Sequence, residues 1–531
     1  MHVAELIAEL SCPNAYPYSV ENVDVQQTHI SVVFLAGPYV YKVKKAVNMG
    51  FLDFSTLAKR RHFCEEEVRL NRRLAAEVYL GVVPIIRTNK GAQFEGDGEA
   101  IEWAVKMQRL PQTATLQERL RRGEVGVELA ERFARRVAAF HQTAEASPRI
   151  AEFGRFEVVA KVINDIFHQA RGQVGTTVHA DVFGRIKRLA EESIIRLQPL
   201  IEARAERGVP RDCHGDLHLD HVYFFPDRQP PRDLVIIDCI EFNERFRFID
   251  PVADMAFAAM DFAFYGRKDL ADAFAQAYFE ATKDEDGRSL LPLYTAYRAT
   301  VRGVVDGLLL AESEVPDVDR AAARTRARAH WLLALAELEK PERRPCLLLV
   351  AGLPGTGKST LARILAATHG FSLVRSDVVR KELAGISILE QTPQRIKEQL
   401  YSPEWNERTY AECLQKSERL LFEGKRVLVD ATFRDDGNRQ RFFDLATRYD
   451  VPAGMLVCEA GPEVVRRRLE DRRGDASDAN WAVYARLAQS WSPPSESVNR
   501  RTRVISTEGT VMLASSRAAE ALRELGLLDG C

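Results

Sequence analysis

The chain has 531 residues, of which 46% are hydrophobic and 28% are charged, and its formal net charge is −2. At roughly 150 residues per domain, this length excludes a single small binding module and predicts two or three folding units. The near-zero charge argues against a protein that coats nucleic acid or another polyanion over a long footprint.

Neither a membrane span nor a disulfide framework is expected. The sequence has no run of about 18 apolar residues, and the N-terminus lacks the basic and apolar segments of a secretory signal. The eight cysteines are scattered and form no CxxC pair, which favours reduced thiols over disulfides or a thiolate zinc site. We therefore expect a cytoplasmic protein.

Residues 25–110 are predicted to be rich in β-structure. Two segments of alternating hydrophobicity, 29–36 and 39–45, flank a Gly37-Pro38 turn, as the strands of a hairpin do. The other elements expected before residue 340 are, in chain order, a helix at 60–75, helices within 128–205, short strands and loops within 209–250, and helices within 252–340.

The clearest domain boundary lies near residue 340. A helical pattern over 317–338 gives way to a charged segment bracketed by prolines, and an apolar strand then opens at Cys346. Beyond this point strands alternate with helical stretches, which predicts a parallel α/β sheet. We predict these divisions: domain 1–338 with a small lobe at about 20–110 and a large lobe at about 111–338, linker 339–345, and domain 346–531.

Two acids that each follow a probable strand define the first candidate site. Asp216 lies in CHGDLHLDH (213–221), and Asp238 lies in LVIIDCIE (234–241). This is the layout of a kinase catalytic loop followed by a metal-binding acid. One carboxylate positions the acceptor hydroxyl, and the other holds Mg²⁺ against the ATP phosphates.

The upstream partners of such a site are also present. Lys42 lies on the second strand of the hairpin, and Glu67 lies on the following helix, where it can pair with that lysine. Lys44 is the competing choice, because it faces the same side under a two-residue period. The segment MQRL, with Met107 and Arg109, is the expected hinge against the adenine.

With VAAFHQTA (137–144), the HGDLH core and the ID–E pair, the segment at about 20–320 resembles the aminoglycoside phosphotransferase family, which has a bilobal protein-kinase-like fold. The resemblance implies that Asp216 is the catalytic base and Asp238 the metal acid. The family usually has Asn five residues after the catalytic Asp, whereas this chain has His221 in that metal-ligand position. Imidazole binds Mg²⁺ less well than oxygen ligands do, so the activity of this half stays open.

The histidines of this segment allow an alternative. His214, His218 and His221 spell HxxxHxxH, which could hold zinc. The catalytic-loop context accounts for His214, and no further ligand set has zinc spacing, so we expect His218 to be a packed or hydrogen-bonding loop residue. Glu241 and Glu244 are expected to be solvated surface acids, with binding of a cationic acceptor as the alternative.

The strongest motif is GLPGTGKS at 352–359, which matches GxxxxGK[ST] in full between an apolar strand and a probable helix. Glycines let backbone N–H groups turn toward phosphates, the lysine reaches the β- and γ-phosphates, and the serine hydroxyl ligates Mg²⁺. The predicted ATP-binding residues are Gly352, Leu353, Pro354, Gly355, Thr356, Gly357, Lys358, Ser359 and Thr360.

Further polar residues suit phosphoryl transfer. Asp430 ends an apolar strand, as an acid on the Mg²⁺ side does, while Asp377 follows another strand and could accept a proton from the attacking hydroxyl. Arg380 could hold an acceptor phosphate. Arg468 and Arg472 lie one helical turn apart and suit a lid, with a solvated basic helix as the alternative. A surface acid or helix cap is the alternative for Asp377.

Through GLPGTGKST, VRSDVVRKELAG, VLVDATF, the Arg-rich stretch and SDA, residues 345–531 resemble the AAA-type small P-loop kinase domains related to polynucleotide kinase, zeta toxins and small-metabolite kinases. The resemblance implies that Asp377 is the base, that Arg380 contacts the acceptor and that Asp430 lies near the metal. It also implies lid roles for Arg468 and Arg472.

We therefore expect a mixed α/β and α+β chain in which a bilobal kinase-like unit precedes a P-loop domain with a parallel sheet. ATP and Mg²⁺ are the predicted cofactors of both. The first hypothesis is a bifunctional phosphotransferase, whose acceptor is a small molecule or the 5′-hydroxyl end of a nucleic acid. In the alternative only the P-loop kinase is active, and the N-terminal domain binds a ligand or regulates.

Overall fold

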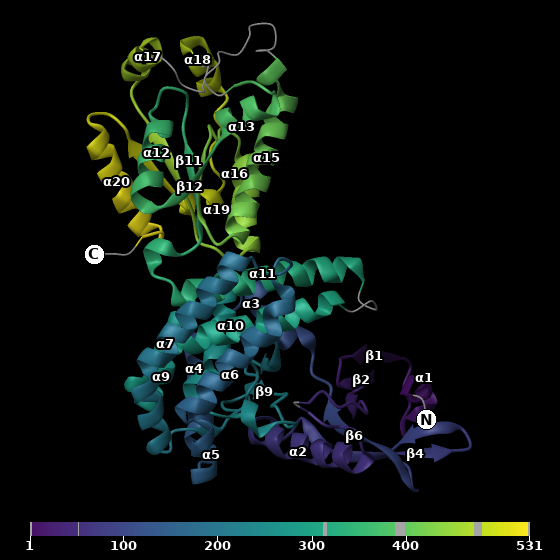
Figure 1. The fold of residues 1–531 in the computed structure, drawn as a ribbon. Helices are drawn as coiled ribbons and strands as arrows, with labels where there is room; N and C mark the ends of the chain where they lie inside the picture. Colours follow the sequence, from purple (N-terminus) through teal and green to yellow (C-terminus); the bar gives the residue numbers. More distant parts are fainter. Residues whose placement is uncertain (1–2, 51, 312–315, 388–398, 472–479, 529–531) are drawn as a thin grey trace. The chain divides into compact units, whose positions relative to one another are not determined.

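The computed structural model describes residues 3–50, 52–311, 316–387, 399–471 and 480–528 (Figure 1). The chain forms two compact units, the first made of Met1–Val162 and Arg196–Thr295, the second of Ile163–Ile195 and Ala296–Cys531. Among the described residues, no helix has both the length and the apolar character needed to span a bilayer. The seven cysteines in these ranges are free thiols, as predicted.

A six-stranded antiparallel sheet forms the small lobe of the first unit, in the order β1-β2-β3-β6-β4-β5. The predicted hairpin is confirmed, because Ala36 pairs with Tyr39 across the Gly37-Pro38 turn. One face packs a core of aromatic and branched side chains, including Phe34, Tyr41 and Phe94. The strands are β1 (Val23–Gln27), β2 (Ser31–Ala36), β3 (Tyr39–Lys44), β4 (Tyr79–Thr88), β5 (Gly91–Phe94) and β6 (Ala100–Gln108).

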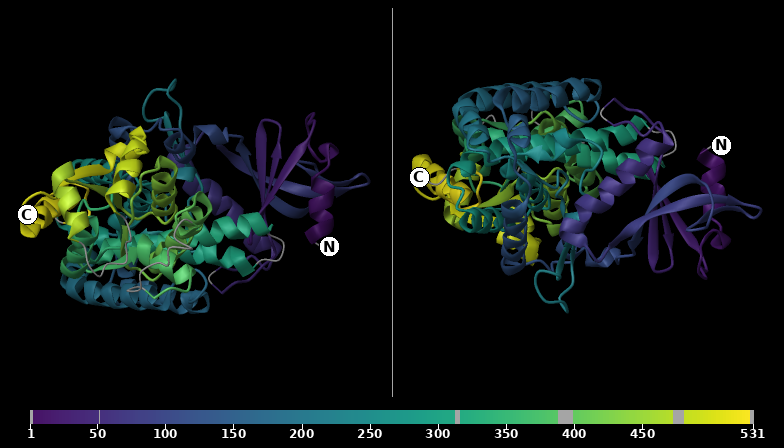
Figure 2. Two further views of the ribbon diagram at one scale, coloured as in Figure 1. Left: turned by 90° about the horizontal axis from the view of Figure 1, so that it is seen from above. Right: turned by 90° about the horizontal axis from the view of Figure 1, so that it is seen from below.

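Helix α2 (Leu57–Ala75) lies across this sheet, against β4 and β6 (Figure 2). It begins after Thr56, whose side chain accepts a hydrogen bond from the Lys59 N–H and so caps the helix. Its buried face includes Cys64, Val68 and the acidic Glu67. A buried carboxylate requires a charged partner, and strand β3 supplies one.

The rest of the first unit is mainly helical and contains two short antiparallel strand pairs, β8 with β9 and β7 with β10. Helix α8 starts at Pro251 after Asp250, whose carboxylate accepts from the Val252 N–H. Besides α1 (Val3–Leu10), α2 and the six strands of the sheet, the α-helices and strands that lie wholly within this unit are α3 (Leu116–Arg121), α4 (Val127–Thr143), α5 (Pro148–Phe153), β7 (Arg211–Asp212), β8 (Val222–Phe224), β9 (Leu234–Ile236), β10 (Phe248–Ile249), α8 (Pro251–Phe264) and α9 (Lys268–Thr282).

The second unit contains a five-stranded parallel sheet in the order β12-β13-β11-β14-β15 (Figure 1). The predicted parallel sheet is confirmed, and the strand expected to open at Cys346 is β11, which lies at the centre of the sheet. It is buried at every position, as a strand covered on both faces must be. The strands are β11 (Cys346–Ala351), β12 (Phe371–Arg375), β13 (Arg426–Asp430), β14 (Ala453–Glu459) and β15 (Thr502–Ser506).

Helices cover both faces of this sheet. Helices α12 and α20 pack together, and α15 packs beside α16 (Figure 1). The helices of this part are α12 (Lys358–His369), α13 (Ser376–Leu383), α15 (Pro403–Phe422), α16 (Asp436–Arg448), α17 (Pro462–Glu470), α18 (Trp481–Gln489), α19 (Glu496–Arg500) and α20 (Val511–Glu524). The fold is therefore the predicted combination of a kinase-like unit and a P-loop α/β domain.

The packing units do not follow the predicted boundary along the chain. Helix α11 (Asp317–Leu338) and the first part of α7 (Ala180–Glu206) belong to the same unit as the parallel sheet. Arg185 of α7 shows why: it donates to the carbonyl oxygen of Gly424 at 2.8 Å and pairs with the buried Glu339 at 2.7 Å. The predicted linker at 339–345 is therefore packed against a helix.

Candidate active sites

Lys42 on strand β3 lies at the centre of the first site, which we call the N-terminal site and define by Lys42, Glu67, Asp216 and Asp238. The lysine Nζ is 2.6 Å from Asp238 Oδ1 and 2.9 Å from Glu67 Oε1. Burial alone would raise the pKa of Asp238, but the charge and the hydrogen bond of Lys42 act against burial, and the pKa lies below its ordinary value. The carboxylate is therefore ionised, as a metal ligand must be.

Lys44 occupies a different position and is only 3% exposed. Its Nζ is 2.7 Å from Glu67 Oε2 and also pairs with Glu241. Glu67 thus bridges two lysines, and Lys42 rather than Lys44 lies against Asp238. The expectation that Glu241 is a solvated surface acid is wrong: it is 6% exposed, because Lys44 provides a buried counter-ion for it.

Asp254 on α8 fixes the loop that carries Asp216. Its carboxylate accepts hydrogen bonds from the backbone N–H groups of His214, at 2.9 Å, and Gly215, at 2.8 Å. Gly215 has a φ of +89°, and a Cβ there would lie 2.9 Å from the backbone oxygen of Phe246. Only glycine fits at this position. The hydrogen bonds to Asp254 and the close approach of the Phe246 backbone together hold the loop in one conformation.

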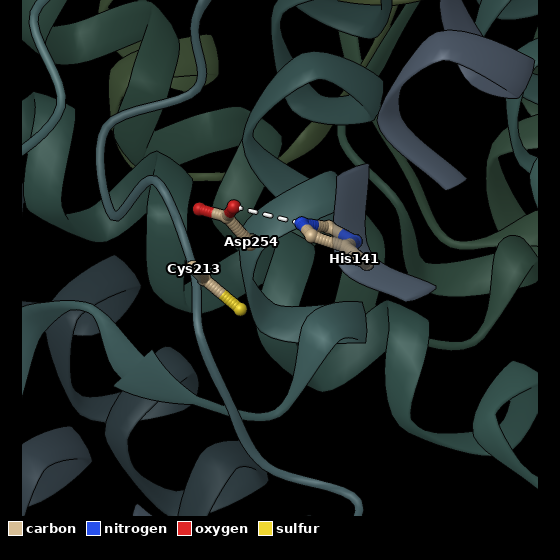
Figure 3. Close-up of side chains that lie close together, drawn as sticks. All are labelled: His141, Cys213 and Asp254. Atoms are coloured by element: carbon tan, nitrogen blue, oxygen red, sulfur yellow. Dashed lines mark hydrogen bonds and ion pairs between the residues drawn. The ribbon is translucent and has the colours of Figure 1, made fainter. Parts of the chain in front are cut away.

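Figure 3 shows Asp254 between His141 and the segment at Cys213. The Nε2 atom of His141 is 3.0 Å from Asp254 Oδ2, and its Nδ1 atom is 2.8 Å from the Tyr278 hydroxyl. Burial raises the pKa of the Cys213 thiol well above its ordinary value, so the sulfur is a poor metal ligand. We interpret this group as structural support for the loop that carries Asp216.

The zinc alternative for three histidines does not match the geometry. His214 donates from Nε2 to the carbonyl oxygen of Ile237 at 2.9 Å, while its Nδ1 accepts from the Asp216 N–H at 3.3 Å. Both ring nitrogens are therefore occupied, and burial lowers the pKa of His214 to about 4. His218 and His221 remain near Asp216, with their ring centroids 3.9 Å apart.

The predicted hinge lies where the small-lobe sheet ends. Met107 on β6 is 8% exposed and packs in a cluster with Val40 and Tyr79. Arg109 follows the end of the strand, and its N–H donates to the Pro38 carbonyl at 2.8 Å. The structure thus places MQRL at the junction between the sheet and the following helices, and contact with adenine stays a prediction.

The second site, which we call the C-terminal site, follows strand β11 and comprises the residues 352–360 with Asp377 and Asp430. The phosphate loop turns from β11 into α12, whose first residues are Lys358 and Ser359. Gly352 has a φ of +140°, and a Cβ there would lie 2.6 Å from the Cys458 carbonyl oxygen. The loop therefore passes too close to β14 for any side chain.

Asp430 ends β13 beside this loop. Burial raises its pKa, while Lys358 and a hydrogen bond with Ser359 act in the opposite direction. Its Oδ1 is buried and has no hydrogen-bond partner among the described residues, and its Oδ2 accepts from Arg375 at 3.3 Å. An orphaned carboxylate oxygen beside a serine hydroxyl is a donor set that fits Mg²⁺.

Two of the remaining predicted residues lie on α13. Asp377, in its first turn, is close enough to raise the pKa of Asp430 by its charge. Arg380 is 6% exposed and donates to the Leu400 carbonyl and to Asn406 Oδ1, at 2.8 Å for the latter. Its guanidinium is therefore engaged within the domain, and this conformation does not present it to an acceptor.

Arg468 on α17 reaches the phosphate loop. Its Nη2 donates to the Thr507 carbonyl at 2.7 Å and its Nη1 to the Thr507 hydroxyl at 3.2 Å, and that hydroxyl donates to the Thr356 carbonyl at 2.5 Å. This position beside the phosphate loop is compatible with the prediction that Arg468 acts at the phosphate-binding site. Arg472 lies outside the described residues.

Sequence reasoning missed three residues of these sites. Asp254 lies within an apolar helix, and a buried acid in such a context was the available signal for a structural role. Thr507 carried no local signal, because its partner Thr356 is distant along the chain. The pairing of Glu241 with Lys44 was also missed, although Glu241 follows Asp238 closely in the sequence and Lys44 follows Lys42.

Comparisons with known proteins match both halves. A model described as "Phosphotransferase enzyme family" matches residues 39–293, and one described as "AAA domain" matches residues 347–494. An uncharacterized protein of Mycobacterium tuberculosis (strain H37Rv) is 33% identical over 476 residues, which cover 90% of this chain and 91% of that protein.

Two solved kinase structures are also similar. A choline/ethanolamine kinase family protein from Mesorhizobium loti covers 63% of this chain and 97% of its own, with 14% identity and a TM-score of 0.36. A gluconokinase from Sinorhizobium meliloti 1021 covers 35% of this chain and 95% of its own, with 17% identity and a TM-score of 0.25.

Proposed function

We propose that this chain is a bifunctional ATP-dependent kinase. It belongs to the same family as the Mycobacterium tuberculosis protein, and it joins a phosphotransferase-family domain to a P-loop AAA-type domain. Each half transfers the γ-phosphoryl group of ATP to a hydroxyl acceptor. The observation that carries the proposal is that each half gathers a lysine and an acid of the types that phosphoryl transfer uses: Lys42 with Asp238, and Lys358 with Asp430.

In the N-terminal site, Lys42 binds the α- and β-phosphates once ATP separates it from Asp238. Asp238 would hold a divalent cation, which when bound neutralises the charge of the phosphates. Asp216 accepts the proton of the acceptor hydroxyl as its oxygen attacks the γ-phosphorus. The Asp254 carboxylate keeps Asp216 in place through the backbone of its loop.

In the C-terminal site, backbone N–H groups of the phosphate loop bind the β- and γ-phosphates, and Lys358 balances their charge. Ser359 and Asp430 would hold Mg²⁺. Asp377 accepts the acceptor proton, since it lies near Asp430 at the same edge of the sheet. Arg468 contributes positive charge from the side of α17.

A second candidate function follows from one observation. His221 occupies the position of a metal-binding Asn and lies between the carboxylates of Asp216 and Asp238. If this imidazole excludes a cation, the N-terminal half binds a nucleotide or another ligand without transferring phosphate, and only the P-loop half is a kinase.

Two variants of the full-length protein separate these functions. We expect Lys358→Ala to abolish one ATP-consuming activity and Asp216→Asn to abolish another, measured as transfer from γ-labelled ATP to hydroxyl-bearing metabolites, nucleosides and 5′-hydroxyl oligonucleotides. Loss of all transfer with Lys358→Ala alone would contradict a bifunctional enzyme. An unlabelled oligonucleotide beside labelled metabolites would exclude the nucleic-acid acceptor.

A further inference from the structure

The position of His221 points to the kind of metal that the N-terminal site takes. Its ring lies between two acids: Nδ1 is 3.7 Å from Asp216 Oδ2, and Nε2 is 3.6 Å from Asp238 Oδ2. The side chain is 17% exposed, so the ring is largely removed from water. This inference rests on the proposed function, because it concerns the cation of that same site.

The hydrogen bonding of His221 fixes which nitrogen can bind a metal. Nδ1 lies 3.1 Å from the backbone carbonyl oxygen of Asp216. A carbonyl oxygen only accepts, so Nδ1 must carry a proton and donate it. Metal-binding histidines characteristically donate their other ring N–H to a carbonyl or carboxylate in this way, which orients the ring and leaves Nε2 as the ligand.

The partner of Nε2 is a carboxylate. In the neutral ring Nε2 carries a lone pair, and it faces Asp238 Oδ2 at 3.6 Å, too far for a hydrogen bond. Two electron-rich atoms facing each other are stabilised by a cation between them. With bonds of about 2.1 Å, two ligands of one first-row metal ion stand about 3.0–3.6 Å apart, which agrees with this spacing.

More donors lie close by. Single ligand atoms of Asp216, His218 and His221 lie within 4.8 Å of one another, and His218 Nε2 is 3.3 Å from Asp216 Oδ2. The N-terminal site thus offers imidazole nitrogens together with carboxylates. The C-terminal site, in contrast, offers the oxygens of Ser359 and Asp430.

We propose that His221 and Asp238 bind a first-row transition metal ion in preference to Mg²⁺, so that the two halves use different cations. Imidazole strengthens the binding of ions such as Co²⁺ and Zn²⁺, whereas Mg²⁺ favours sites made of oxygen ligands. The departure from the Asn of the resembling family is then a change of metal rather than a loss of the site.

The test is Co²⁺ binding to tag-free full-length protein, followed by the visible absorption of the bound ion and by equilibrium dialysis. We expect the wild-type protein to bind Co²⁺ with a spectrum typical of nitrogen ligation and to retain it in a tenfold excess of Mg²⁺. His221→Asn should weaken this binding at least tenfold. His62→Asn, which changes an exposed histidine of α2, is the matched control and should bind as the wild type does.

Asp238→Asn provides a second variant, in case His221→Asn does not fold as judged by circular dichroism, and it should also lose the bound ion. Unchanged Co²⁺ binding in either folded variant, or displacement by equimolar Mg²⁺, would overturn the inference. Phosphoryl transfer is measured separately: binding through His221 without any transfer by the N-terminal half refutes its proposed function but not the metal site.

Discussion

The two candidate sites are built by different means. The N-terminal site is built from ionised side chains that neutralise one another, with Lys42 and Lys44 on one strand and Glu67 between them. The C-terminal site is built around backbone: a glycine-rich turn leads into the start of α12, whose first residue is Lys358. The N-terminal site therefore consists mainly of ion-paired side chains, and the C-terminal site consists mainly of backbone.

This difference determines what each site depends on. Paired charges in a buried place are stable only while every partner is present and correctly ionised. A backbone cradle depends instead on close approach of the main chain, and it is insensitive to the titration of side chains. Removing one charged side chain or changing the pH should therefore strongly affect the N-terminal site. The C-terminal site should instead be affected by substitutions that add side-chain atoms to the phosphate loop.

The largest expected effect comes from removing Lys44. Lys44→Met leaves Glu241 and one oxygen of Glu67 buried without their cation, which should destabilise the small lobe by about 3–5 kcal/mol. The measurement is hydrogen exchange of the β3 amides in the full-length protein, which reports the local opening free energy.

Two controls test whether charge is the cause. The double variant Lys44→Met/Glu241→Gln removes both members of the pair and should recover part of the lost stability. Lys59→Met breaks a pair with Asp53 in which both side chains are exposed, so its effect should stay below about 1 kcal/mol. Equal effects of Lys44→Met and Lys59→Met would contradict the buried-charge argument.

The N-terminal site should also be the acid-sensitive one. Burial lowers the pKa of His214 to about 4 from an ordinary value of 6.5. Between these pH values the unfolded chain binds more protons than the folded chain. Stability is therefore lost as the pH falls from about 6.5 to about 4, by about 3 kcal/mol in total, and this group causes no loss above that window.

Urea unfolding of the first unit at several pH values between 7 and 4 measures this loss. His214→Gln is the comparison, since Gln can donate to the Ile237 carbonyl and accept from the Asp216 N–H but does not titrate in this range. We expect the difference in stability between wild type and variant to shift in favour of the variant as the pH falls. Parallel pH profiles would contradict this role of His214.

The same contrast explains what the sequence could predict. The phosphate loop is contiguous, so its eight residues predicted the turn, the strand before it and the helix after it, and all three are present. The N-terminal site joins β3 to residues almost 200 positions later. The motifs predicted its members, but the choice between Lys42 and Lys44 required knowing how each lysine meets Asp238 and Glu241.

Predictions failed where a side chain had partners far away along the chain. Glu241 was expected on the surface, because its pattern in the sequence does not reveal the lysine that neutralises it. Arg380 was predicted to contact the acceptor; in this conformation two of its guanidinium nitrogens donate to Leu400 and Asn406 instead. Helix α11 belongs to the same compact unit as the parallel sheet, which the change in composition near residue 340 does not reveal.

The C-terminal site should be sensitive to volume. Gly352→Ala places a Cβ 2.6 Å from the Cys458 carbonyl oxygen and demands a positive φ, so we expect at least a hundredfold loss of ADP affinity at this site. Calorimetric titration of the full-length Lys42→Ala protein isolates that site. Gly370→Ala is the control: its φ is +67°, but nothing lies within 4 Å of the added atom. It should cost about 1 kcal/mol of stability and leave ADP binding unchanged.

The smallest effect concerns the tie between the phosphate loop and Arg468. Thr507→Val keeps the side-chain volume but removes the hydroxyl that donates to the Thr356 carbonyl and accepts from Arg468. A neutral hydrogen bond is worth about 1 kcal/mol, so the KM for ATP of the C-terminal half should rise about fivefold. Thr502→Val removes a hydroxyl at the start of β15, where it bonds the Val498 carbonyl, and should leave KM unchanged.

Combining Thr507→Val with Arg468→Ala decides how the arginine acts. If Arg468 serves the site only through the Thr507 hydroxyl, the double variant should lose no more than Thr507→Val alone, because that variant has already removed the hydroxyl. If Arg468 also stabilises charge on the transferring phosphoryl group, Arg468→Ala should lower kcat as well, whereas Thr507→Val raises KM alone. A lowered kcat in Arg468→Ala with normal kcat in Thr507→Val would therefore assign the arginine to the reacting phosphate, a role that backbone donors of the loop cannot replace.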